Sequence, residues 1–201
     1  MEQLPGFVTQ GEYGKVCHLK KSLQSTAGST LLIVYVDDIV ITGTDYAGIS
    51  SLKSFLHTKF HTKDLGQLKY FLGIEVNRCK KGIFLSQRKY ILDLLAETGK
   101  LAAKPCSTPV VPNLHLMKDD GDPFNDPGRY RRLVGRLNYL TVTRPYIAFA
   151  VSVVSQFMSA PTVKHWAALE QILCYLKEAP GLGILYSNRG HSHTECFADA
   201  D

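Results

Sequence analysis

Two adjacent aspartates, Asp37 and Asp38, are the residues of this sequence whose type and spacing best suit chemistry. They lie between two short apolar runs, at residues 31–36 and 39–42. Adjacent carboxylates repel each other, and a divalent cation held between them and a phosphate relieves that repulsion. The pair therefore favours metal-assisted phosphoryl transfer. The alternative is an ordinary solvated turn, in which aspartate is common.

The elements that position this pair are predicted from the pattern of apolar residues. The two runs predict a tight β-hairpin with the carboxylates at its tip. Thr44 or Asp45 can cap a following helix, whose apolar residues keep helical spacing. Residues 70–76 and 82–85 predict a second hairpin around a basic turn at residues 77–81.

The rest of the chain predicts helices around a proline-rich linker. Ser86 is expected to cap a short helix that ends near Gly99. Five prolines between residues 104 and 127 exclude a long helix or a central strand there. Helical patterns follow at residues 130–141, 145–158 and 163–177. Two strands, at residues 183–186 and 195–198, are predicted to begin a new sheet, and the fold class is α+β.

The composition indicates a globular protein and argues against a membrane protein. Hydrophobic residues make up 45% of the 201 residues, enough to bury a core in one or two domains. The longest apolar stretch is too short to cross a bilayer, and the first residues lack a signal-peptide pattern. An intracellular protein without a membrane segment is therefore expected. The five cysteines include no Cys-x-x-Cys pair, and a net charge of +5 is compatible with a polyanionic partner.

Other polar and aromatic candidates have simpler explanations. His57 and His61 have the helical spacing of a metal-binding pair, but the sequence offers no third ligand nearby. The surface of an amphipathic helix explains them equally simply. Trp166 stands at a helical position and is predicted to lie in the core or at an interface.

Longer segments occur in an order that is characteristic of one family. They are Pro5-Gly6-Phe7-Val8, Tyr35-Val36-Asp37-Asp38-Ile39, Lys63-Asp64-Leu65-Gly66, Tyr70-Phe71-Leu72-Gly73-Ile74-Glu75-Val76, Leu133-Val134-Gly135, Thr143-Arg144-Pro145, Tyr175-Leu176-Lys177 and Asp199-Ala200-Asp201. By these segments the sequence resembles copia-type retrotransposon reverse transcriptases over nearly the whole chain. So many short segments in one order make an accidental match implausible.

The resemblance implies a division into three parts. Residues 1–86 would form an incomplete polymerase palm built on antiparallel hairpins. Residues 87–180 would form the thumb and connection helices, with the proline-rich linker at residues 104–127. Residues 181–201 would be the truncated start of a ribonuclease H-like sheet.

The resemblance also assigns roles to acidic residues. In relatives the first aspartate of the hairpin, here Asp37, ligates Mg²⁺, and Asp38 lies beside it at the catalytic site. Asp199 corresponds to the first metal-binding aspartate of the ribonuclease H domain. Mg²⁺ is therefore the implied cofactor, and its binding is expected to be weak or absent if the site is incomplete.

The implied partners are an RNA or DNA primer-template and a deoxynucleoside triphosphate. By the resemblance, Tyr35 and Val36 would lie near the end of the primer. Gly73 would belong to the hairpin that grips the primer strand, with Lys80 and Lys81 near backbone phosphates. A solvated basic turn is the competing explanation for the two lysines.

The sequence departs from the family pattern at three places. Relatives supply a further catalytic aspartate from an earlier strand, whereas the acidic residues before Asp37 are Glu2 and Glu12. Residues 24–30 replace a longer segment of relatives. Tyr146 stands where relatives commonly carry an aspartate that would stabilise a helix N-terminus by roughly half a kcal/mol.

These departures predict an inactive or severely impaired remnant of an RNA-directed DNA polymerase. Two-metal phosphoryl transfer needs carboxylates from more than one place in the fold. Two alternatives stay open, a polymerase fragment that another chain complements and a nucleic-acid-binding module without chemistry. Whether the isolated chain is an enzyme is not decided by the sequence.

Overall fold

The structure is a computed structural model that describes residues 23–25, 28–112, 114–118, 121–188 and 190. The chain divides into two compact units, residues 1–68 and residues 69–201, which are described separately. This division falls earlier than the predicted end of the palm segment at residue 86. The strand predicted at residues 195–198 and Asp199 lie outside the described residues.

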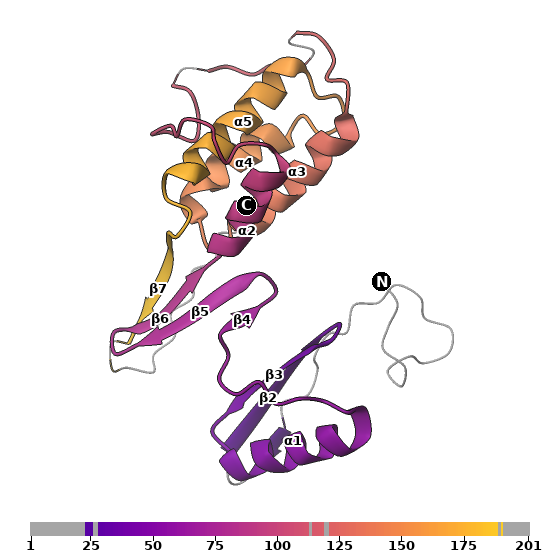
Figure 1. The fold of residues 1–201 in the computed structure, drawn as a ribbon, viewed down its shortest axis with the longest axis vertical. Helices are drawn as coiled ribbons and strands as arrows, with labels where there is room; N and C mark the ends of the chain where they lie inside the picture. The colour runs from indigo at the N-terminus through magenta and orange to yellow at the C-terminus, as the bar shows by residue number, and fades with distance from the viewer. Residues whose placement is uncertain (1–22, 26–27, 113, 119–120, 189, 191–201) are drawn as a thin grey trace, which may run out of the picture. The chain divides into compact units, whose positions relative to one another are not determined.

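The first unit contains the predicted aspartate hairpin and the helix that follows it. Its described strands are β1 (Leu23–Ser25), β2 (Gly28–Tyr35) and β3 (Asp38–Gly43), which pair antiparallel in the order β1-β2-β3. Helix α1 (Tyr46–Phe60) packs against β3 (Figure 1). The Asp45 carboxylate accepts the Gly48 amide at 2.8 Å and caps the helix, as predicted.

The second unit contains a sheet whose last strand comes from the distant end of the chain. Among the described residues, its strands are β4 (Tyr70–Phe71), β5 (Ile74–Cys79), β6 (Gly82–Ser86) and β7 (Gly183–Ser187), antiparallel in that order. The predicted hairpin is confirmed between β5 and β6. The single strand predicted at residues 70–76 is wrong, because a turn at Leu72 and Gly73 divides it into β4 and β5. The expectation that the strand at residues 183–186 begins a new sheet is wrong, because β7 pairs along the whole of β6 (Figure 1).

Helices form the core of the second unit. They are α2 (Arg88–Glu97), α3 (Pro127–Leu140), the 3₁₀ turn η1 (Pro145–Ile147), α4 (Ala148–Ser155) and α5 (Val163–Glu178). Their apolar stripes bury one cluster of aliphatic side chains, including Leu94, Leu137, Val151 and Leu173. The helices predicted between residues 130 and 177 are therefore confirmed, and Trp166 packs against this cluster, stacked on Phe124.

Capping explains where these helices begin. Asp126 accepts the Arg129 amide at the start of α3, which has proline in its first turn. Thr162 and the buried His165 form a capping box at the start of α5. The expected cap at Ser86 is wrong, because Ser86 ends β6 and Gln87 takes the cap position without a side-chain hydrogen bond.

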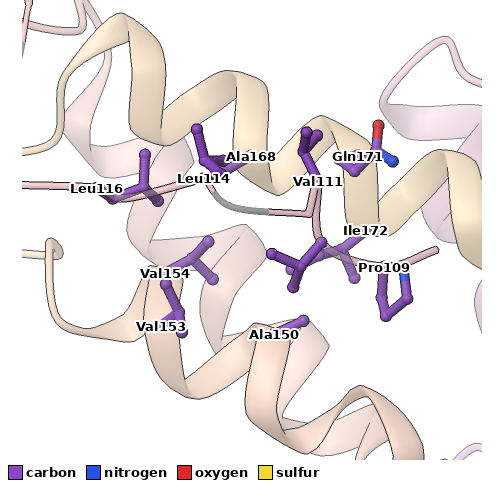
Figure 2. A pocket seen from close by; sticks show the side chains of 11 residues that line it. Pro109, Val111, Leu114, Leu116, Ala150, Val153, Val154, Ala168, Gln171 and Ile172 are labelled. Atoms are coloured by element: carbon purple, nitrogen blue, oxygen red, sulfur yellow. The ribbon is translucent and has the colours of Figure 1, made fainter.

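The described residues of the proline-rich segment before α3 lie over α4 and α5 without regular helix or strand, as predicted. This segment closes a small pocket with the two helices, lined by aliphatic side chains such as Val111, Leu116, Val154 and Ile172 (Figure 2). Gln171 is the polar residue of that lining. The pocket therefore has no set of groups suited to catalysis.

The architecture agrees with the α+β fold class, since the described residues form helices and two antiparallel sheets. No described helix is long and apolar enough to cross a membrane.

Candidate functional site

The two aspartates lie at the tightest point of the first hairpin. Tyr35 of β2 pairs directly with Asp38 of β3, so the turn between the strands consists of Val36 and Asp37 alone. Two-residue hairpin turns require at least one residue with positive φ, and Val36 has φ 50°. The short turn fixes Asp37 beyond the ends of the strands and Asp38 at the first position of β3.

The backbone of Val36 is strained. The left-handed region is uncommon for a β-branched residue and costs about 1–2 kcal/mol. Strands β2 and β3 form six consecutive residue pairs, from Thr30 with Gly43 to Tyr35 with Asp38. This pairing fixes the register of the hairpin and offsets the cost of the strained turn. Strain of this kind clusters at functional sites, where a fixed geometry is needed.

The carboxylates of Asp37 and Asp38 are exposed to solvent. In the part of the chain that the structure describes, neither forms a hydrogen bond or ion pair, and no group of three potential ligands could hold a metal ion. Mg²⁺ is commonly bound by one or two carboxylates together with substrate phosphates and water. The pair therefore fits one Mg²⁺ ion shared with a phosphate, but no carboxylate from a second element accompanies it among the described residues.

An apolar sheet face adjoins the carboxylates. Side chains alternate between the faces of a strand, so Leu31, Ile33 and Tyr35 share one face with Asp38. Leu31, Ile33 and Tyr35 are 48%, 45% and 42% exposed. The hairpin therefore presents acidic groups beside an apolar surface, which suits a ligand that carries both phosphate and flat apolar rings.

Gly73 lies in the turn between β4 and β5. Phe71 pairs with Ile74, which leaves Leu72 and Gly73 as another two-residue turn, with φ values of 51° and 81°. Positive φ at both positions is the type I′ pattern, for which glycine is well suited and leucine is not. Gly73 therefore occupies a backbone position that the turn requires.

Lys80 and Lys81 form the turn at the opposite end of β5. Cys79 pairs with Gly82, so the predicted five-residue turn is reduced to the two lysines, and both are exposed. Among the described residues neither lysine has a carboxylate partner. The six residues of β5 separate this turn from Gly73 by about 20 Å. The second hairpin thus carries a glycine turn at one end and an unpaired basic turn at the other.

The contacts of the remaining residues show which of them have a structural role. The His57 Nδ1 atom lies 2.7 Å from the Thr62 carbonyl oxygen and closes the end of α1, so the surface-helix interpretation suffices. Two residues that the sequence analysis did not propose as site residues have specific contacts. Tyr139 donates a hydrogen bond to the Leu72 carbonyl, and Arg144 is buried in the helical core. The contacts of both residues join segments that are far apart in the sequence, and no local sequence pattern predicts them.

Comparisons with known proteins give one consistent result. The family described as "Reverse transcriptase (RNA-dependent DNA polymerase)" matches residues 24–112. The retrovirus-related Pol polyprotein from transposon RE1 of Arabidopsis thaliana is 38% identical over 236 residues, which cover 100% of this chain and 16% of the relative. The corresponding polyprotein from transposon TNT 1-94 of Nicotiana tabacum is 32% identical and covers 100% of this chain and 19% of the relative.

An uncharacterized mitochondrial protein of Arabidopsis thaliana is 38% identical over 85% of this chain and 70% of its own length. The chain spans only 16% of the two Arabidopsis polyproteins that it matches. The alignment with the RE1 polyprotein is longer than the chain, so that relative contains residues without a counterpart here. No solved structure matches.

Proposed function

The chain belongs to the reverse transcriptases of copia-type retrotransposon Pol polyproteins, and we propose that it is a partial polymerase unable to extend a primer alone. The observation that carries this proposal is the strained two-residue turn that exposes Asp37 and Asp38. Such a turn suits a site that must present two carboxylates rigidly to a metal and a triphosphate. In the described residues no further carboxylate accompanies them.

The two carboxylates would together bind one ion and orient the triphosphate. Mg²⁺, when bound by Asp37, would neutralise phosphate charge and favour ionisation of the primer hydroxyl. Asp38 would hold water or the ion from the strand position beside it. The uncovered face of Leu31, Ile33 and Tyr35 would contact the sugar and base at the primer end.

The first prediction concerns polymerisation. The isolated chain, given primer-template, deoxynucleoside triphosphates and Mg²⁺, is expected to show no incorporation above that of an Asp37→Asn/Asp38→Asn control. The reason is the shortage of carboxylates, since two-metal transfer needs ligands from more than one element. The measurement is gel-resolved primer extension over several hours.

Two results would change this view. Incorporation by the unmodified chain, abolished in the control, would contradict inactivity. Incorporation that appears only on mixing with a fragment carrying the earlier aspartate strand of a relative would establish a complemented polymerase. In that case Asp37→Asn should abolish the activity of the mixture.

The other domain assignments are part of the same proposal. Residues 87–180 would be the thumb and connection, which agrees with their helical content. The ribonuclease H domain would begin after β7, since that strand belongs to the sheet of β4, β5 and β6. Asp199 would be the first metal-binding aspartate of that domain.

A second candidate function is nucleic-acid binding without chemistry, and the exposed turn of Lys80 and Lys81 favours it. Each lysine that neutralises a phosphate contributes about 0.9 to the slope of log affinity against log salt concentration. The Lys80→Ala/Lys81→Ala variant is therefore expected to reduce that slope by about 2. Fluorescence anisotropy with a labelled primer-template duplex at several salt concentrations measures it.

The control for this prediction is Lys53→Ala. Lys53 is also an exposed lysine, but its ammonium group lies 2.9 Å from an Asp64 carboxylate oxygen, so its loss should leave the slope unchanged. Binding should also survive Asp37→Asn. An unchanged slope in the double lysine variant would mean that the two lysines form a solvated basic turn and do not contact phosphates.

A further inference from the structure

The turn of Leu72 and Gly73 has little support from its own strands. Strand β4 is two residues long and pairs only with β5 among the described residues. Both turn residues have positive φ, which leucine rarely adopts. A two-residue strand at the edge of a sheet is marginally stable by itself. Something outside the hairpin must therefore hold the turn in this conformation.

Tyr139 supplies that contact from helix α3. Its hydroxyl donates a hydrogen bond to the carbonyl oxygen of Leu72, a residue far away in the sequence. Its helical neighbours Leu137 and Leu140 are completely buried in the core. The tyrosine thus connects the buried helical core of the unit to the backbone of the turn.

The ring of Tyr139 is itself held in place. The ring of Tyr90, on α2, meets it edge to face with centroids 5.6 Å apart. The guanidinium carbon of Arg136 lies 5.1 Å from the centroid of Tyr90, and Arg136 forms an ion pair with Glu97. A continuous series of contacts runs from Glu97 to the turn.

The same rings lie against Gly73. A Cβ atom placed on Gly73 would lie 3.4 Å from Cδ2 of Tyr90 and 3.8 Å from Cε1 of Tyr139. The Tyr70 hydroxyl would lie 3.9 Å from it. Three tyrosine side chains therefore lie close to the position that a Cβ atom on Gly73 would occupy.

We propose that Tyr139 is a positioning residue for the Leu72–Gly73 turn, fixing the backbone that the second hairpin presents to the primer strand. This inference rests on the proposed function of that hairpin. In this role Tyr139 acts through the backbone of the turn. Its hydroxyl holds the Leu72 carbonyl, and its ring blocks rotation of the turn toward α3.

The test is Tyr139→Phe, which keeps the ring and removes the hydroxyl. Tyr46→Phe is the matched control, because Tyr46 is 83% exposed on α1 and loses the same atom. Amide hydrogen exchange of residues 70–76 in the free chain is expected to accelerate about tenfold in Tyr139→Phe, as loss of one hydrogen bond implies. Exchange in α3 and α5 should remain unchanged.

A second measurement uses a primer-template whose primer ends in 2-aminopurine. Tyr139→Phe is expected to weaken binding about tenfold and to change the fluorescence of the bound primer end, whereas Tyr46→Phe does neither. Unchanged exchange at residues 70–76, or acceleration spread uniformly over the helices, would overturn the positioning role. If the unmodified chain fails to bind the duplex, the proposed function fails, and the exchange measurement still decides the role of Tyr139.

Discussion

Replacing Arg144 with methionine is expected to lower the free energy of unfolding of the second unit by about 3 kcal/mol. The Arg144 side chain is 1% exposed. Its Nη2 atom donates to the carbonyl oxygens of Ala179 and Pro180 at 2.9 and 2.6 Å, and Nη1 donates to the Tyr146 hydroxyl at 2.6 Å. Methionine fills similar space but leaves these three acceptors without their donor.

Two opposing effects decide the sign of this change. Burial lowers the pKa of Arg144, because the charged guanidinium is costly to remove from water. Its Nε atom also has no partner among the described residues. Removing the charge therefore recovers some free energy. Hydrogen bonds from a charged group are worth about 1.5–3 kcal/mol each, so the loss of three outweighs that recovery.

The measurement is urea unfolding followed by fluorescence. Trp166 is the single tryptophan of the sequence, and its ring stacks on Phe124 within the second unit, so its emission reports unfolding there. Arg144→Lys is the control, because a lysine keeps the charge but cannot reach three acceptors as a planar fork does. It should lose roughly half as much stability. A methionine variant more stable than the parent would mean that the desolvation cost of the buried guanidinium exceeds the stabilisation from its three hydrogen bonds.

Arg144 also gives Tyr146 a role that the sequence did not suggest. The sequence predicts that Tyr146 loosens a helix end that an aspartate would stabilise. In the structure its hydroxyl instead accepts a bond from Arg144, and its ring meets that of Tyr175 edge to face. The tyrosine thus provides a neutral acceptor for the buried guanidinium. Its effect on the helix end stays a prediction.

The parts of the fold that were predicted correctly depend on neighbours in the sequence. Apolar runs separated by polar turns predicted the aspartate hairpin and the pairing of β5 with β6, and capping residues such as Asp45 located helix starts. Asp37 and Asp38 were found for the same reason, since their hairpin is a local element. Their metal-binding role depends on groups from elsewhere, and it stays a prediction.

The errors share a physical cause, which is that long-range contacts leave no local pattern. Ser86 has the residue type of a helix cap, but pairing with Glu75 and Gly183 keeps it in the sheet. The Leu72 carbonyl finds its donor in Tyr139 from α3. Strand pairing and buried polar contacts between distant segments override local propensity in each case.

Replacing Gly82 with alanine is expected to detach β7 from β6, at a cost of about 3 kcal/mol. Gly82 has φ 143°, and a Cβ atom there would lie 2.0 Å from the Tyr186 carbonyl oxygen in the facing strand. No side-chain rotation relieves a collision with backbone. Amide protection of residues 183–187 should therefore fall about a hundredfold, as measured by hydrogen exchange.

Gly183→Ala tests the same pairing of β6 with β7 from the other strand. Its Cβ atom would lie 2.0 Å from the Leu85 carbonyl oxygen, so it should release β7 by itself. Because either substitution removes the same pairing, the double variant should cost clearly less than the sum of the two. Gly135→Ala is the control, since a Cβ atom on that α3 glycine meets no heavy atom within 4 Å and should stabilise the helix by about 0.5–1 kcal/mol. Full protection of residues 183–187 in both variants would contradict the close approach of the two backbones at Gly82 and Gly183.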